Sequence, residues 1–233
     1  MDLSYQWVLL SRCSDMRNTV TYIAVIILLA VVFVFVAREF WESFKWMAVH
    51  LKLYMWFFIG IGSYFILRLI PQLKKNEEWL QTFSHELSHT IVGLLFFQRI
   101  HSFQAGEKSG AVYHSGHRFG ETFISLAPYY LPIFTFAFLL LRIIGAWKSL
   151  YIFDIFIGFT LAFHCLCFAK QTRSYQTDIS SVGYVKAYLF IACALLFNLT
   201  IILLSIRKGI VNANIYLFTN YWDDIVSAVK FIF

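Results

Sequence analysis

Long apolar runs recur along the 233-residue chain and limit its fold more than any other feature. The first run, Thr19 to Ala37, is almost purely apolar and ends at Arg38-Glu39. A helix of about 20 apolar residues crosses the hydrocarbon core of a bilayer, so this run predicts a membrane-spanning helix. It is too long for the core of a signal peptide, and no small-residue cleavage site follows it. We therefore interpret it as a retained span.

Five later segments are also long enough for us to expect membrane-spanning helices. They are residues 53–70, 76–98, 121–144, 151–168 and 185–206. In lipid, a backbone satisfies its polar groups only as a helix or a closed barrel. The runs predict an all-α, polytopic bundle of about six transmembrane helices, in which Pro71 ends the second span and Asn76 caps the third. Residues 207–233 are expected to form an amphipathic tail at the interface.

The composition supports a membrane protein and gives no indication of a nucleic-acid partner. Only 14% of the residues are charged, against about 25% in ordinary soluble domains, and 60% are hydrophobic. The net charge is +6, but Lys and Arg flank the apolar runs, where they suit lipid headgroups. The four cysteines form no Cys-x-x-Cys pair, so neither a disulfide framework nor a cysteine metal site is indicated. The predicted partner is the lipid bilayer, and the oligomeric state is left open.

A polar His-Glu-x-x-His motif, His85 to His89, lies within the third apolar segment. Its two histidines are one helical turn apart, so both imidazoles can reach one ion. A catalytic zinc takes three protein ligands and leaves a position for water. Glu86 would lie beside that water and could accept its proton. Ionisable groups in an apolar membrane segment are costly, which favours a zinc site over a pair of core histidines.

Two irregular segments follow the motif. Ile100 to Gln104, a turn flanked by glycines and Ala111 to His114 predict a short β-hairpin. An exposed edge of this hairpin could pair with an extended peptide, although a plain connecting hairpin explains the pattern equally well. The next span contains Pro128 and Pro132, which predict a break in the helix at membrane depth.

The third zinc ligand must come from downstream of the motif. The candidates are His101, His114, His117, Glu121, Asp154, His164 and Asp178. Asp154 has a suitable depth, because alternation of the spans places it on the side where the motif helix begins. Asp178 would reach the metal only if the polar segment 170–184 folded inward, against protein or a water-filled cavity. The residues themselves leave Asp154 and Asp178 open.

Together these features resemble the site-2 protease clan of intramembrane zinc metalloproteases. In that family the His-Glu-x-x-His helix is followed by a strand-bearing loop and then by a span with a Gly/Pro-type break, which Ser125 to Pro132 resembles. A later span leads to a segment whose Asp is the third ligand, and Phe159 to Asp178 resembles it. The family's Pro, Asn and Gly residues around that Asp are absent here, where Ile179-Ser180 follows.

The resemblance implies a metalloprotease that hydrolyses peptide bonds in or near transmembrane segments of a membrane-protein substrate. It implies a Zn²⁺ ion bound by His85, His89 and Asp178, with Glu86 as the catalytic base. The implied divisions are amino-terminal transmembrane helices, a metalloprotease core, and the last helix end with its tail (1–75, 76–190 and 191–233). The family's oxyanion-stabilising Asn is absent, and the candidates for that role are His101, His114, His117 and Lys170.

Two other functions are compatible with such a chain. A non-catalytic chaperone or transport-like protein could keep the same bundle, although the intact Glu86 argues against it. A membrane di-iron hydroxylase or desaturase needs several histidine boxes, whereas this chain has 7 scattered histidines and no His-x-x-His-His. Metal analysis of the purified protein would separate the three.

Overall fold

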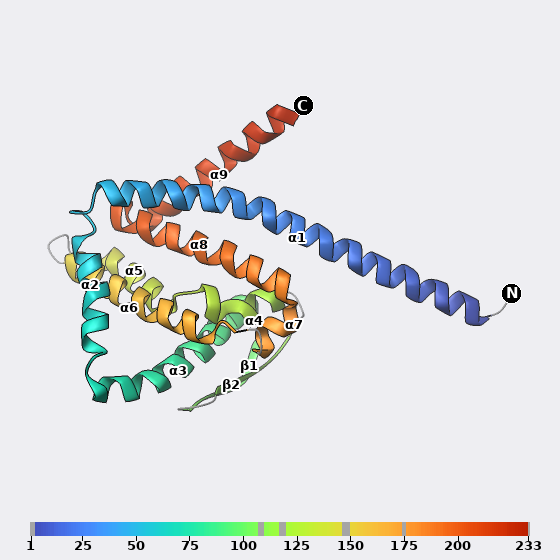
Figure 1. Ribbon diagram of the computed structural model, residues 1–233, viewed down its shortest axis with the longest axis horizontal. Helices are drawn as coiled ribbons and strands as arrows, with labels where there is room; N and C mark the ends of the chain where they lie inside the picture. The colour runs from blue at the N-terminus through green and yellow to red at the C-terminus, as the bar shows by residue number, and fades with distance from the viewer. Residues whose placement is uncertain (1–2, 107–109, 117–119, 146–149, 174–175, 233) are drawn as a thin grey trace.

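The computed structural model describes residues 3–106, 110–116, 120–145, 150–173 and 176–232. Within them the chain is mostly helical, with one two-stranded antiparallel sheet (Figure 1). The elements are α1 (Leu3–Val49), α2 (Met55–Leu67), α3 (Pro71–Leu95), β1 (Arg99–Ala105), β2 (Gly110–Ser115), α4 (Glu121–Tyr130), α5 (Ile133–Ile144), α6 (Leu150–Gln171), α7 (Thr177–Val182), α8 (Tyr184–Lys208) and α9 (Ile210–Ile232).

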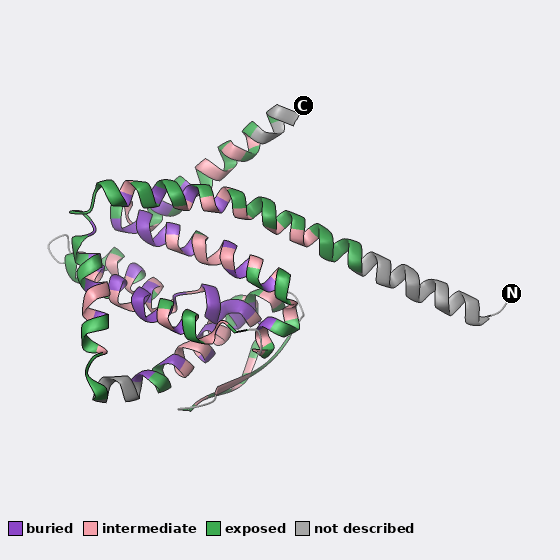
Figure 2. Cartoon of the chain, in the orientation of Figure 1, coloured by how far each residue is buried: buried purple, intermediate pink, exposed green. Residues whose placement is uncertain are grey.

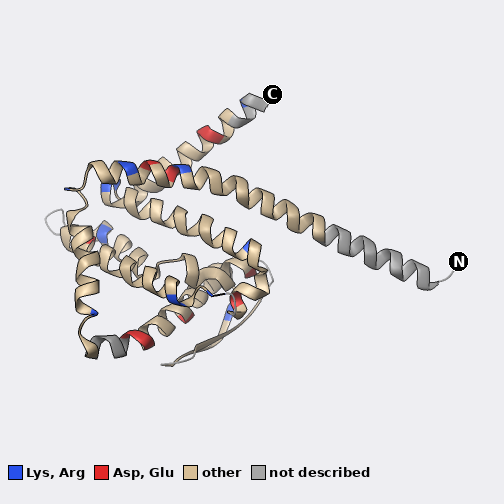
Figure 3. Cartoon of the chain, viewed as in Figure 1, with Lys and Arg blue, Asp and Glu red and all other residues tan. Residues whose placement is uncertain are grey.

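Three of these helices are long and apolar enough to cross a membrane, so the chain is a multi-pass integral membrane protein. They are Thr19–Val49 of α1, α6 and α8. The pair α4 and α5, bent by 83° at its break, makes a fourth if it is counted as one span. Figure 3 shows that α8 carries no charged residues along most of its length.

The expectation of about six spans exceeds this number. Helix α2 lies in the expected second span but has only 13 residues, fewer than the roughly 20 that a bilayer requires. Helix α3, which carries the motif, begins with the polar sequence 72–78 and is not among the apolar helices of spanning length. Among the described residues, candidate spans therefore number three or four.

The boundary between α2 and α3 also differs from the prediction. Helix α2 ends at Leu67, and Pro71 is the first residue of α3 rather than the end of the helix before it. Proline suits this position because the first N–H groups of a helix have no partner within the helix. Asn76 consequently lies inside α3 and does not cap it.

The predicted hairpin and helix break are both present. Strands β1 and β2 pair antiparallel from Arg99 opposite Ser115 to Ala105 opposite Gly110, with an irregularity between Ile100 and Ser102. Helix α4 contains Pro128 and stops at Tyr130, and α5 begins directly after Pro132.

The core holds the inner helices together and leaves Thr19–Val49 of α1 largely exposed (Figure 2). One buried cluster packs α4, α7 and α8 together and includes Ile124, Tyr129, Ile179 and Ile191. A second cluster joins α2, α6 and α8. The first cluster matters most for the site, because it fixes the short helix α7 against the bent pair.

Helices α2 and α6 approach closely through two glycines. A Cβ at Gly60 would collide with the carbonyl of Ile155, and a Cβ at Gly158 would collide with the carbonyl of Phe57. Small residues at such crossings allow helix backbones to come together in membrane proteins.

We expect Gly60→Leu to destabilise the protein, by about 1–3 kcal/mol, because the new side chain must separate α2 from α6. The measurement is thermal unfolding of the purified protein in detergent. Gly62→Leu, in the same helix, is the matched control, since its Cβ meets nothing within 4 Å. Equal unfolding temperatures for the two variants would contradict the close crossing.

Candidate metal centre

The histidines of the motif lie on one face of α3 and meet a carboxylate from α7. The Oδ2 atom of Asp178 is 3.3 Å from Nε2 of His85 and 3.6 Å from Nε2 of His89. Ligand atoms bound tetrahedrally to zinc at about 2.1 Å lie about 3.4 Å from one another. The observed separations therefore match those around a single zinc ion.

Hydrogen bonds fix the orientation of both imidazoles. His89 donates from Nδ1 to the carbonyl oxygen of Ile124 at 2.8 Å, and His85 donates from Nδ1 to Oε1 of Gln171 at 3.3 Å. A neutral imidazole has one N–H, so each ring then presents an unprotonated Nε2 to Asp178. Two nitrogen lone pairs and a carboxylate oxygen facing one another require a positive charge between them. This donor set fits zinc, and such outer contacts commonly orient zinc-binding histidines.

The carbonyl that orients His89 is available because of Pro128. In a regular helix the carbonyl of Ile124 would accept the N–H of residue 128, but proline has no N–H. The break predicted from the two prolines thus supplies the metal centre with an acceptor. Its position at the site follows from the packing of α4 against α3 (Figure 1).

The cluster also bears on the choice between the two Asp residues. Among the described residues, the group of His, Cys, Asp and Glu side chains close enough to hold a metal is His85, His89 and Asp178. Asp154 instead lies in α6 with its Oδ1 3.0 Å from Nε of Arg142. The geometry thus brings Asp178, and not Asp154, to the histidines.

The remaining candidate side chains have other surroundings. His101 contacts the hydroxyl of Ser115 at 2.5 Å, His164 is buried in α6, and Lys170 contacts Gln81 at 3.4 Å. Glu121 is exposed in the first turn of α4, and His117 lies outside the described residues. His114 remains beside the site, because it lines the same cleft as the histidines.

A polar cleft of about 380 Å³ gives access to the cluster. Residues 110–114 of β2 form one side of it, and Ser125, Gln176 and Thr177 also line it. Glu86 is buried against β2, where a Cβ on Gly110 would lie 2.6 Å from its Oε1. A side chain at position 110 would therefore displace the carboxylate, so the glycine makes room for the predicted base.

The ionisation of the cluster indicates that it attracts positive charge. Burial alone would raise the pKa of Asp178, but when no ion is bound and His85 and His89 are protonated, their hydrogen bonds hold it well below its usual value. Burial lowers the pKa of His89, yet Asp178 raises it above its ordinary value. The pKa of Glu86 is raised by burial, while the two histidines act to lower it. When no metal ion is bound, protons on these side chains would supply the positive charge that a bound cation otherwise supplies.

Sequence reasoning missed three contributors to this site. They are Gln171, which accepts from His85; Tyr129, whose hydroxyl donates to Oδ2 of Asp178 at 3.1 Å; and Gly110. Gln171 and Tyr129 lie at or within segments that the sequence predicts as membrane spans, and only their tertiary contacts distinguish them from other residues of those helices. The sequence predicts a turn flanked by glycines, but it does not predict the contact of Gly110 with Glu86, which joins β2 to α3.

Comparison with known proteins gives one family match. The Peptidase M50B-like family matches residues 63–219, which include the motif helix, the hairpin, the bent pair and α7. No curated protein and no solved structure matches the chain.

Removing the carboxylate of Asp178 is expected to cost the protein most of its zinc. The change is Asp178→Ala, and zinc is measured per folded protein after exhaustive dialysis, by elemental mass spectrometry. Asp154→Ala is the matched control and should retain its zinc, because Asp154 pairs with Arg142. The reverse outcome, with zinc lost only from the Asp154 variant, would make Asp154 the ligand.

Proposed function

Because the chain belongs to the Peptidase M50B-like family of site-2 protease-like intramembrane metalloproteases, we propose that it is a zinc endopeptidase. Its substrates are membrane proteins, which it cleaves in or near their transmembrane segments. His85, His89 and Asp178 hold the ion. The observation that carries the proposal is that Asp178 lies 3.3 Å from His85 and 3.6 Å from His89, beside a buried carboxylate and a polar cleft.

The residues of the site have separate tasks in this reaction. Bound zinc supplies Lewis acidity, which lowers the pKa of a water towards about 7 and polarises the scissile carbonyl. Glu86 accepts a proton from the attacking water and delivers it to the leaving amine. Gln171 and the carbonyl of Ile124 hold the two imidazoles, and Tyr129 holds Asp178. His114 lines the cleft and is the side chain that we assign to the developing oxyanion.

We expect Glu86→Gln to abolish turnover while zinc remains bound, because the ligands survive and the base does not. Both quantities are measured on one preparation in detergent or vesicles, with a membrane-spanning reporter substrate and metal analysis. Loss of zinc from this variant would make Glu86 a ligand or a structural residue. A zinc-loaded wild-type protein that cleaved no membrane substrate would favour the non-catalytic alternative.

The unpaired edge of strand β2 is a candidate site for binding the substrate as an extended peptide. Within the described residues the strand pairs on one side with β1, and residues 110–114 line the cleft beside Glu86 and the histidines. An extended peptide could add to the unpaired edge through main-chain hydrogen bonds, which place its carbonyls along the cleft. Such binding would require the substrate helix to unwind locally before cleavage.

Proline substitutions in β2 test this mode of binding. Successive N–H groups of a strand point to opposite edges. One of the variants Val112→Pro and Tyr113→Pro therefore removes an N–H donor from the cleft edge, and the other removes a hydrogen bond to β1. We expect at least one of them to lower cleavage about tenfold, the loss of roughly one well-made hydrogen bond, with zinc content unchanged. Phe103→Pro, in β1, is the control for damage to the hairpin. Normal cleavage by both β2 variants would exclude strand addition.

A further inference from the structure

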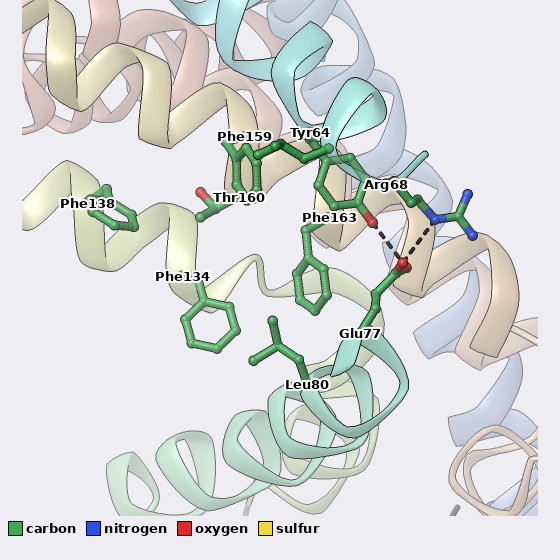
Figure 4. A pocket seen from close by; sticks show the side chains of 10 residues that line it. Tyr64, Arg68, Glu77, Leu80, Phe134, Phe138, Phe159, Thr160 and Phe163 are labelled. Atoms are coloured by element: carbon green, nitrogen blue, oxygen red, sulfur yellow. Dashed lines mark hydrogen bonds and ion pairs between the residues drawn. The ribbon is translucent and has the colours of Figure 1, made fainter. Parts of the chain in front are cut away.

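A second cavity, of about 470 Å³, lies among α2, α3, α5 and α6 (Figure 4). Its walls are almost wholly apolar and include Leu80, Phe134, Phe138, Phe159 and Phe163. The metal cluster does not line it. The proposed hydrolysis therefore leaves this cavity without a role.

Charged side chains gather at one end of the cavity, where Arg68 and Glu77 belong to its lining and Lys170 contacts Glu77 from outside the lining. Nε of Arg68 lies 3.0 Å from Oε2 of Glu77, and Nζ of Lys170 lies 3.8 Å from Oε1 of the same carboxylate. Glu77 also accepts from the hydroxyl of Tyr64 and from the amide of Gln81. Within this group of three described side chains, two cations share one buried carboxylate, which is an excess of one positive charge.

The two cations remain accessible. Their side chains are 27% and 40% exposed, whereas that of Glu77 is 8% exposed. Figure 4 shows the far nitrogens of the Arg68 guanidinium pointing away from Glu77. A guanidinium oriented in this way can form two parallel hydrogen bonds to a phosphate.

The cavity extends from the level of the lipid headgroups towards the interior of the membrane, as a lipid chain does. Lys170 lies in the last turn of α6, a candidate span, so it belongs at the level of the headgroups, and Arg68 shares the carboxylate of Glu77 with it. Thr160 lines the cavity ten residues before Lys170 in α6, about 15 Å deeper at the rise of a helix. A ligand here would have an anionic head and an apolar tail.

We propose that this cavity binds an anionic phospholipid, with its phosphate at Arg68 and Lys170 and one acyl chain between α5 and α6. The charge at one end of the cavity argues against an apolar substrate helix, because such a helix has no anionic group to pair with Arg68 and Lys170. A single extended chain is narrower and suits the aromatic walls.

Native mass spectrometry of the detergent-purified protein tests this site. Phosphatidylglycerol and phosphatidylcholine with identical acyl chains are added in turn, and glycerol phosphate serves as a headgroup without a chain. We expect one phosphatidylglycerol to be retained at least tenfold more tightly than phosphatidylcholine, and glycerol phosphate not to be retained. Equal retention of the two lipids, or retention of glycerol phosphate, would overturn the proposal.

Amino-acid substitutions test whether phosphatidylglycerol binds in this cavity. Lys170→Gln removes one phosphate contact, and Leu80→Trp fills the cavity from a side chain that is already partly exposed. Each is expected to weaken phosphatidylglycerol retention roughly tenfold, since a charge-assisted hydrogen bond contributes about that factor. Lys45→Gln, which removes a cation paired with Glu42 on α1, is the control and should leave retention unchanged. Equal losses in all three variants, no loss in any, or displacement of the lipid by a membrane-spanning peptide would overturn the assignment.

Discussion

The site depends on the contact between one carboxylate and two imidazoles that come from distant parts of the chain. Asp178 lies on α7, a helix of six residues, and could not hold its position without support. Ile179, the next residue, is fully buried in the cluster that joins α7 to α4 and α8. Tyr129 of α4 adds a hydrogen bond to the carboxylate itself. Apolar packing thus determines where the charge is placed.

The break between α4 and α5 serves this arrangement and has its own supports. A backbone that leaves the helix at membrane depth must find other partners for its polar groups. Asn198 of α8 donates to the carbonyl of Tyr130 at 2.9 Å, and the N–H of Leu131 bonds to the carbonyl of Ala127. The carbonyl of Ile124, left free by Pro128, accepts from His89. The bent pair therefore carries its irregular backbone without uncompensated groups at these positions.

The amino-acid sequence predicts the local features of this protein better than it predicts the number of membrane spans or the contacts between distant segments. The motif helix, the hairpin and the break were predictable because each is encoded by spacing or by proline within a short stretch. The number of spans was not, because the apolar segment 53–70 suggested a long helix, whereas α2 ends at Leu67. The sequence also left Asp154 and Asp178 open, because the pairing of Asp154 with Arg142 and the packing of Ile179, beside Asp178, are both contacts between distant segments.

The proline in α4 has a consequence for any attempt to make this protein more robust. Replacing Pro128 with alanine restores an N–H that can close the helical turn onto Ile124, and by the usual rules of helix propensity the variant would gain stability. The same change offers the Ile124 carbonyl a second donor, which competes with the imidazole of His89 for its orientation. In the proposed zinc site, thermal stability and zinc affinity would then change in opposite directions, because a more stable α4 would leave His89 less firmly oriented.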